Sequence, residues 1–407
     1  MKALVIGGGL PQIELIRQLH ERGIVALLAD IISDAVAAPY CDKFFLVEPG
    51  FGPIRKIATE EKVDFLITVC ADQILLDMAK VSEELGLPCY INYKTAQDVS
   101  NKIRMKRIFQ ENAIPSTKYV ETESLDIEVI EQLSYPLVVK PVDAFSSRGV
   151  RKVNNVDELK CYYDEARKIS RTGGVIVEEF FCGDEISVDA FVVHGKAHVL
   201  TITNSEKVKD KDRFVIFRGR YPANISETVL KKIEDVVQKI AESFGLVNSP
   251  LLVQLLSDGE NISVLEFCAR TGGNMKYLLI KYASGVDVIG ATIDIILGKE
   301  PDLRPKYNRN NLVVNDFVYC KPGILDHFEG FEELESAGII NEFHPVRLKG
   351  AQVRGVMSST DRVAGMNIVA NSIEEYNDKL NIINQTVKVI DNQGFDIMRH
   401  DLLPELK

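Results

Sequence analysis

Two charged side chains near the end of an otherwise apolar segment are the residues of this chain best placed to do chemistry. Glu266 and Arg270 lie in residues 251–273, LLVQLLSDGENISVLEFCARTGG, where an Asp-Gly pair separates two apolar runs. This pattern predicts a β-hairpin. Because side chains alternate along a strand, Glu266 and Arg270 should share one face, and the first strand should bring Gln254 close to Glu266.

This group of side chains favours the binding of Mg²⁺ together with phosphate groups. Carboxylate and amide oxygens suit Mg²⁺, and a guanidinium suits a neighbouring anion. Gln254 reaches the face of Glu266 only if the hairpin loop has an odd number of residues, as a three-residue loop would. The alternative is a structural ion pair between Glu266 and Arg270, since charges four residues apart are common. The hairpin alone leaves both interpretations open.

A second group of candidate residues follows residues 137–141, LVVKP. Lys140 ends an apolar strand, so its ammonium should emerge from the core into a site or into solvent. The loop that follows supplies the hydroxyls of Ser146 and Ser147, backbone N–H groups and the flexible Gly149, which together suit a phosphate. The loop lacks the GxxxxGK[ST] pattern of a P-loop, and a solvated surface turn is the alternative.

A third group closes the next predicted strand. Glu178, Glu179, Phe180 and Phe181 follow one another, and Glu185 returns a carboxylate seven residues after Glu178. An aromatic hinge flanked by acids suits a purine nucleoside, with apolar rings on the faces of the base and a carboxylate on the ribose hydroxyls. The alternative is an ordinary β-turn with exposed acids.

Composition limits the kinds of partner. The chain has 407 residues, of which 46% are hydrophobic and 26% charged, a balance typical of a soluble protein with two or three cores. Its net charge of -11 argues against non-specific binding to nucleic acid or to an anionic membrane. Seven cysteines without a CxxC pair indicate reduced thiols. No apolar run approaches the ~20 residues of a membrane span, so we expect a cytoplasmic protein.

The positioning elements begin with an alternation of strands and helices over residues 1–95, which predicts a doubly wound parallel sheet. Residues 2–6 form its first strand, and Gly7–Gly9 follow. This cluster with Asp30 suggests a dinucleotide fingerprint, but Gln12 stands where the third glycine belongs. Nicotinamide binding and a structural turn that lines a substrate cleft both remain open.

The rest of the chain is predicted to be an α+β region followed by a strand-rich tail. Asn101 is the expected N-cap of the first helix of this region. The predicted helices span residues 101–112, 156–170, 226–244, 286–297 and 373–390, and the predicted strands span 118–121, 137–141, 175–179 and 186–193.

These segments, in their order along the chain, resemble the ATP-grasp superfamily over about residues 100–300. The resemblance rests on Lys102 near a helix start, on YPLVVKP and its serine-glycine loop, on VIVEEFFCGDEISVDAF at 175–191, and on VQL…VLEFCARTGG at 253–273. Residues 1–95 resemble the Rossmann-like domain that precedes ATP-grasp in biotin carboxylase, carbamoyl phosphate synthetase, phosphoribosylglycinamide synthetase and the L-amino acid ligases.

The resemblance implies a role for each matching residue toward ATP and Mg²⁺. Lys102 and Lys140 would contact the ATP phosphates, Ser146 to Gly149 would form the covering loop, Glu178, Glu179, Phe180 and Phe181 the adenine hinge, and Glu185 the ribose ligand. Gln254 and Glu266 would bind Mg²⁺, and Arg270 would lie beside the transferred phosphoryl group.

One position departs from the pattern. Cys268 stands where many relatives have Asn, and a thiol is a poor ligand for a hard cation. Either one Mg²⁺ gains a water or Asn274 supplies the oxygen.

The implied architecture is α/β and α+β, in three parts. A Rossmann-like domain (1–95) precedes a two-lobed ATP-grasp domain (96–300, with a lid at about 115–180) and a small strand-rich C-terminal domain (301–407). The implied function is an ATP-dependent ligase that activates a carboxylate as an acyl phosphate and joins it to an amine. A nicotinamide-dependent oxidoreductase and a catalytically lapsed nucleotide-binding protein, suggested by Cys268, are the alternatives.

The expected partners are a small-molecule carboxylate and a small-molecule amine, with neither nucleic acid nor membrane, and a homodimer is compatible with the resemblance. Arg213, Arg218 and Arg220 are candidates for binding the carboxylate, but solvated charges are the favoured interpretation of all three.

Overall fold

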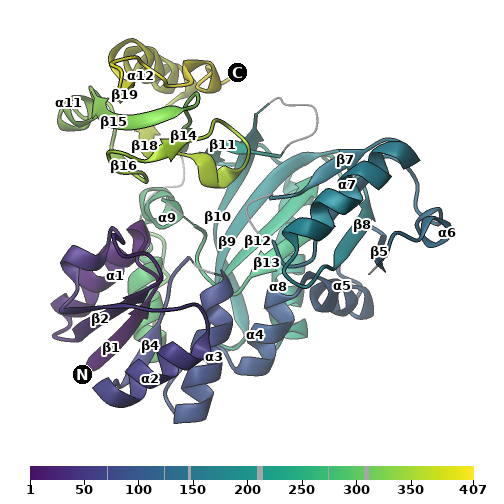
Figure 1. Ribbon diagram of the computed structural model, residues 1–407, viewed down its shortest axis with the longest axis horizontal. Helices are drawn as coiled ribbons and strands as arrows, with labels where there is room; N and C mark the ends of the chain where they lie inside the picture. The colour runs from purple at the N-terminus through teal and green to yellow at the C-terminus, as the bar shows by residue number, and fades with distance from the viewer. Residues whose placement is uncertain (71, 123, 145–147, 209–213, 274, 307–310) are drawn as a thin grey trace.

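The computed structural model describes residues 1–70, 72–122, 124–144, 148–208, 214–273, 275–306 and 311–407 (Figure 1). The N-terminal part, the lid-like lobe and the C-terminal part surround a large central sheet (Figure 1). No helix in these ranges is long and apolar enough to cross a membrane. The predicted mixed class, α/β followed by α+β, is confirmed.

The N-terminal part is a parallel sheet with strand order β3-β2-β1-β4. Strands β1, β2 and β4 are buried apolar runs, as expected for a sheet that is covered on both faces, whereas the edge strand β3 is partly exposed. The elements are β1 (Lys2–Ile6), α1 (Leu10–Glu21), β2 (Val25–Asp30), η1 (Ala38–Tyr40), β3 (Lys43–Leu46), α2 (Phe51–Glu61), β4 (Phe65–Ile67), α3 (Asp72–Leu85) and α4 (Tyr93–Ser100).

Helix α5 (Lys102–Glu111) begins where the sequence predicts, because the Asn101 side chain accepts hydrogen bonds from the backbone N–H groups of Ile103 and Arg104. A four-stranded antiparallel sheet with order β5-β8-β6-β7 follows, and α7 packs on it. The lobe contains β5 (Tyr119–Thr122), α6 (Ile127–Ile130), β6 (Leu137–Pro141), β7 (Arg151–Val153), α7 (Val156–Ile169) and β8 (Val175–Glu179).

The central sheet has eight antiparallel strands in the order β13-β12-β9-β10-β11-β14-β18-β16. Its last three strands come from the C-terminal part, so that part continues the central sheet across the pairing of β11 with β14. The strands are β9 (Asp184–Val193), β10 (Lys196–Lys207), β11 (Ile216–Tyr221), β12 (Ser249–Ser257), β13 (Ile262–Cys268), β14 (Leu312–Val318), β16 (Glu342–Pro345) and β18 (Ala364–Ala370).

Three helices pack against strands of this sheet: α8 (Glu227–Ser243), α9 (Lys276–Ser284) and α10 (Val288–Ile296). The C-terminal part adds a small sheet with order β17-β15-β19. Its further elements are β15 (Gly323–Glu329), α11 (Phe331–Ser336), β17 (Gln352–Val353), η2 (Ser359–Asp361), α12 (Ile373–Thr386), β19 (Lys388–Asp391) and η3 (His400–Leu402).

Two expectations about elements are corrected. The helix predicted over residues 373–390 ends at Thr386, because Val389 and Ile390 pair with β15 as part of β19. The hairpin loop, residues 258–261, has four residues rather than three. Leu265 is an extra residue that shifts the register, so that Gln254 still pairs directly with Glu266. The predicted neighbours therefore meet through a β-bulge instead of an odd-numbered loop.

Candidate active site

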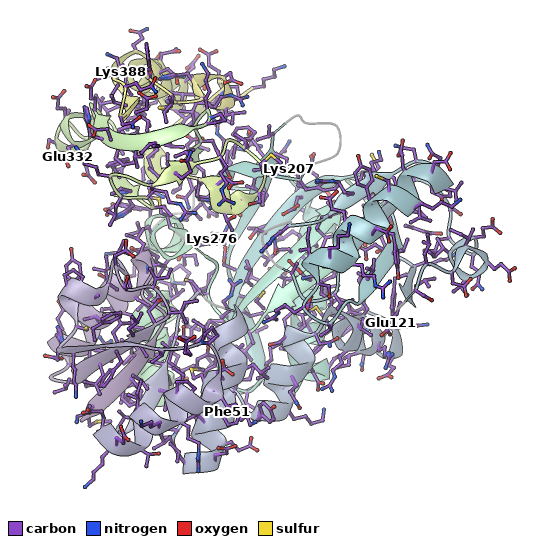
Figure 2. All side chains as sticks on the ribbon, in the orientation of Figure 1. Phe51, Glu121, Lys207, Lys276, Glu332 and Lys388 are labelled. Atoms are coloured by element: carbon purple, nitrogen blue, oxygen red, sulfur yellow. The ribbon has the colours of Figure 1, made fainter. Side chains whose placement is uncertain are left out.

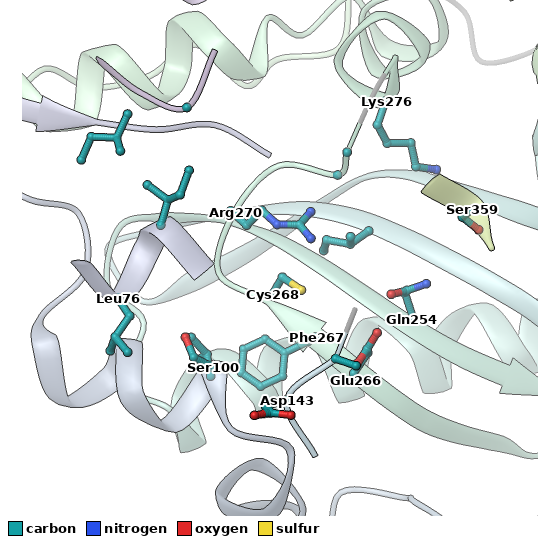
Figure 3. Close-up of a pocket in the computed structure, with 18 of the residues that line it drawn as sticks. Leu76, Ser100, Asp143, Gln254, Glu266, Phe267, Cys268, Arg270, Lys276 and Ser359 are labelled. Atoms are coloured by element: carbon teal, nitrogen blue, oxygen red, sulfur yellow. The ribbon is translucent and has the colours of Figure 1, made fainter. Parts of the chain in front are cut away.

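A cavity of about 690 Å³ lies where the N-terminal part, the central hairpin, the base of the lid-like lobe and the C-terminal part meet. The N-terminal part contributes Gly7 and Asp30 to its lining. The hairpin contributes the largest chemically active group, and Figure 3 shows Gln254, Glu266, Cys268 and Arg270 side by side on it. The hairpin residues that the sequence predicts to act together are therefore assembled in one wall.

Glu266 forms an ion pair with Lys102 of helix α5. The Lys102 Nζ lies 2.7 Å from the Glu266 Oε2 and donates to the backbone carbonyl of Ala144 at 2.9 Å. Lys102 is the first residue of α5, so the Asn101 cap that starts this helix also fixes the direction of the lysine. One side chain thus joins the hairpin to the loop that follows β6.

Gln254 and Glu266 have an arrangement that fits a hard cation. They are directly opposite in the antiparallel ladder, which places their Cβ atoms about 5 Å apart on the same face. One carboxylate and one amide oxygen are ligands that Mg²⁺ accepts while its other positions are filled by phosphate oxygens and water. Among the residues with a described placement, no group of three His, Cys, Asp or Glu side chains forms a separate metal site.

A buried charge cluster lies in the lid-like lobe. The Lys140 Nζ donates a hydrogen bond to the Glu178 Oε1, and the Lys106 Nζ lies 3.0 Å from the Glu178 Oε2. The Thr117 hydroxyl also donates to the Glu178 Oε2, at 3.1 Å. Burial alone would raise the pKa of Glu178, but the two ammonium groups hold that pKa at about 2. The Lys140 ammonium therefore points into a buried ion pair rather than into solvent.

Lys106 was not predicted from the sequence. It lies one helical turn after Lys102 on α5, and its side chain is almost fully buried, which lowers its pKa although Glu178 opposes that effect. The spacing of four residues was a usable signal, because it places both lysines on one face of the helix. Three lysines from two elements thus converge on two glutamates.

The predicted purine hinge connects the lobe to the central sheet. The Glu179 Oε1 accepts from the backbone N–H of Ser134 at 3.0 Å, and the backbone N–H of Phe180 donates to the carbonyl of Pro136 at 2.9 Å. The Lys152 Nζ lies 4.0 Å from the centre of the Phe180 ring, and Phe181 is half-buried. The carboxylate of Glu178 faces lysines and not an exposed turn, so the alternative of exposed acids does not apply to it.

Glu185 lies beside the predicted metal ligands. Its Oε1 accepts from the Gln254 Nε2 at 3.3 Å, and its Oε2 lies 2.7 Å from the Lys207 Nζ. Lys207 lies at the end of β10 (Figure 2). The sequence did not predict its role, because β10 itself was not predicted. Glu185 therefore connects Lys207 of β10 to Gln254 of the hairpin.

Other predicted residues have varied placements. Ser146, Ser147 and Asn274 lie outside the described residues. Gly149 is buried with φ +74°, and an added Cβ would lie 2.8 Å from Ile169, so it packs at the base of its loop. Cys268 lines the cavity.

Arg270 is 8% exposed and also lines the cavity, where its Nη1 donates to the Thr271 carbonyl at 2.9 Å.

The solvated interpretation is wrong for Arg218. This residue is fully buried, and its Nε donates to the Asp316 Oδ1 at 2.6 Å. Arg220 is mostly buried as well, with an Nη2 that donates to the Asn204 Oδ1 at 3.4 Å. Arg213 lies outside the described residues. Burial within the central sheet, which the sequence pattern did not reveal, is the reason for the difference.

The glycine cluster at the start of α1 behaves as a structural turn that lines the cavity. Gly7 has φ +87°, and the backbone N–H of Gly8 donates to the Asp30 carboxylate. A Cβ on Gly8 would lie 2.7 Å from that of Ala35. Asp30 thus uses an N–H group that a dinucleotide phosphate would need, which favours the structural interpretation over nicotinamide binding.

Comparison with known proteins agrees with this geometry. Residues 133–277 match a family model described as "ATP-grasp domain". The chain is 21% identical over 393 residues to the multifunctional protein ura1 of Schizosaccharomyces pombe, a match that covers 93% of this chain and 17% of that protein.

Two solved structures share the fold over nearly the whole chain. The L-amino acid ligase from Bacillus licheniformis has a TM-score of 0.79 at 21% identity, and phosphoribosylglycinamide synthetase from Anaerococcus prevotii has 0.77 at 18%. Each comparison covers 96% of this chain and 99% of the other. The predicted resemblance is confirmed.

Proposed function

We propose that this chain, whose residues 133–277 match a model of the ATP-grasp domain, is an ATP-dependent ligase that joins a small-molecule carboxylate to an amine. The observation that carries the proposal is the pairing of Gln254 with Glu266 in the wall of a 690 Å³ cavity, with Lys102 at 2.7 Å from Glu266. These three groups can hold a phosphate chain and its cation at one place.

The reaction needs this kind of site because a carboxylate does not react with an amine at neutral pH. In the proposed first step a carboxylate oxygen of the substrate attacks the γ-phosphorus of ATP, the bond to the β-phosphate oxygen breaks, and ADP leaves. In the second step the amine nitrogen attacks the acyl carbon, the acyl–oxygen bond breaks, and phosphate leaves while the nitrogen loses a proton. Both steps move negative charge, which the protein must balance.

We assign this balance to cations in the cavity wall and in the neighbouring lobe. Gln254 and Glu266 would hold Mg²⁺, which would supply positive charge to the phosphate groups. Lys102 and Arg270 lie in the cavity wall, and Lys140 lies in the lobe next to it, so we assign them to the phosphates and to the transferred group. The ion pairs of Lys102 with Glu266 and of Lys140 with Glu178 keep these ammonium groups in place before the nucleotide arrives.

Water must be excluded while the acyl phosphate exists, and the lobe of residues about 115–180 is suited to that task. We assign it as the lid, with Ser146 to Gly149 as the covering loop, Glu178, Glu179, Phe180 and Phe181 as the adenine hinge, and Glu185 as the ribose ligand. We retain the division into residues 1–95, 96–300 and 301–407 as a proposal. A cytoplasmic location and a homodimer belong to the same proposal.

The test is ADP and phosphate release by purified protein with a panel of carboxylates and amines. We expect Lys140→Ala and Glu266→Ala each to lower substrate-dependent ADP release by at least about 10²-fold, since the first removes a cation assigned to the phosphates and the second removes an assigned Mg²⁺ ligand. Lys160→Ala on α7 and Glu260→Ala in the hairpin loop are matched controls, because both side chains are exposed. Turnover retained in both site variants would refute the assigned roles.

A further inference from the structure

Arg362 lies in the C-terminal wall of the same cavity and is 7% exposed. It follows the 3-10 turn η2 and precedes β18. Ser359 from this turn also lines the cavity, together with Gln254 and Lys276 (Figure 3). A guanidinium from the C-terminal part therefore shares a chamber with the predicted metal ligands on the hairpin.

The contacts of Arg362 are polar or aromatic rather than ionic. Its Nε donates to the carbonyl of Ser359 at 2.6 Å, and its guanidinium lies 3.9 Å from the centre of the Phe317 ring. The Tyr319 hydroxyl is hydrogen-bonded to it and donates in turn to the carbonyl of Ile216 at 2.8 Å. Within the described ranges, no carboxylate oxygen forms an ion pair with Arg362 at 4.0 Å or less.

Its nearest acid in sequence is engaged elsewhere. Asp361 accepts from the backbone N–H groups of Met357 and Ser358, at 3.0 and 2.7 Å, and thereby caps the turn. Lys276 differs from Arg362, because its ammonium lies 3.0 Å from the Asp189 Oδ2 and donates to the Thr203 hydroxyl at 2.6 Å. Arg362 is thus a cavity cation whose charge is not balanced by a neighbouring carboxylate of the described part of the chain.

Such an arrangement is costly for the free protein. A guanidinium stays protonated in proteins, and a buried charge without a counter-ion is strongly unfavourable. Burial lowers the pKa of Arg362, with Tyr319 opposing the effect. Proteins retain such costs mainly at binding sites, where a ligand supplies the missing charge.

We propose that Arg362 binds an oxyanion, a carboxylate or a phosphate, that one of the two substrates carries in addition to its reacting group. This inference rests on the proposed ligase function, because it assigns the substrate to the cavity that the nucleotide shares. The Nε donates to the Ser359 carbonyl, so the N–H groups of the terminal nitrogens that Tyr319 leaves unused hold the anion, and the ring of Phe317 orients the guanidinium. The substrate class is an amino acid or another compound with a second anionic group.

The test measures anion binding with the nucleotide site already filled. A non-hydrolysable ATP analogue with Mg²⁺ is first titrated into wild type, Arg362→Gln, Arg362→Lys and the control Arg347→Gln, followed by thermal shift. Arg347 is exposed and donates to the Thr360 carbonyl at 2.9 Å, so it belongs to the same segment but not to the cavity lining. Inorganic phosphate and malonate are then titrated separately into the saturated complexes, which distinguishes a phosphate from a carboxylate.

We expect wild type and Arg347→Gln to bind one of the two anions, Arg362→Gln to bind it at least tenfold more weakly, and Arg362→Lys to be intermediate. Without ligands, Arg362→Gln should melt at the same temperature as wild type or higher, whereas a purely structural arginine would give a lower melting temperature. Equal anion binding in Arg362→Gln and wild type, or no anion binding to wild type, overturns the inference while the analogue still binds. Failure of the analogue to bind overturns the proposed function instead.

Discussion

Glu178→Gln is the substitution for which the structure gives the clearest energetic expectation. The carboxylate is 3% exposed and is shared by Lys106 and Lys140. The drop of its pKa from the ordinary 4.5 to about 2 corresponds to about 3 kcal/mol, at ~1.36 kcal/mol for each pH unit. Removing one partner of a buried ion pair costs about 3–5 kcal/mol in other proteins, so both estimates agree in size. We therefore expect Glu178→Gln to lower the free energy of unfolding of the lid-like lobe by about 3 kcal/mol.

The pH dependence follows from the direction of this shift. Because the pKa of Glu178 in the folded chain lies below its unfolded value, its stabilisation is complete above about pH 4.5 and is lost as the pH falls toward about 2. Wild type should therefore lose stability over this window. Glu178→Gln should lack that contribution to the acid dependence, because an amide does not titrate there.

The measurement must localise the effect, since a chain of this size need not unfold in one step. Hydrogen exchange of peptides from residues 119–179, compared with peptides from β12 and β13, reports the lobe separately from the central sheet. Glu179→Gln is the matched control, because its carboxylate is on the next residue of the same strand and accepts from the Ser134 backbone. Equal lobe stability in Glu178→Gln and Glu179→Gln, or a more stable Glu178→Gln, would refute the reasoning.

Two further predictions concern packing and thiol reactivity. Gly183→Ala should destabilise the protein by about 1–3 kcal/mol, because the added Cβ would lie 2.5 Å from the Ser257 carbonyl oxygen. Gly52→Ala is the control and should not destabilise it, because no atom lies within 4 Å of the added Cβ. Thermal melts followed by circular dichroism compare the two variants. Iodoacetamide at neutral pH should label the exposed Cys161 and Cys182 well before Cys320, because burial raises the pKa of the Cys320 thiol to about 12, and mass spectrometry of a time course would contradict this if all three reacted equally.

Local patterns account for the parts of the fold that the sequence predicts well. The strands and helices of the N-terminal part follow from apolar periodicity, and the start of α5 follows from the Asn101 cap. Strand β10 was missed because polar residues occupy three of its five buried positions, Thr201, Thr203 and Asn204. The Thr201 hydroxyl donates to Asp189, and that of Thr203 donates to the Ser187 carbonyl, so a buried strand reads as a hydrophilic one.

The site itself depends on register that no local pattern contains. The proximity of Gln254 to Glu266 was predicted, but through an odd-numbered loop, and the Leu265 bulge that produces it appears only when both strands are aligned. The role of Lys106 likewise depends on the pairing of Tyr119 with Glu178, which brings the carboxylate to the start of the lobe.

Arg218 and Arg362 show why charge type alone does not identify a ligand site. Both are almost fully buried arginines that stack near aromatic rings. Arg218 pairs with Asp316, which the neighbouring strand β14 places opposite it in the sheet register. The Asp316 carboxylate therefore balances the charge of Arg218 inside the fold. Arg362 contacts only neutral groups among the described residues and lines the cavity. The difference between a structural and a ligand-binding arginine is therefore decided by a partner about 100 residues away, and only the folded chain reveals it.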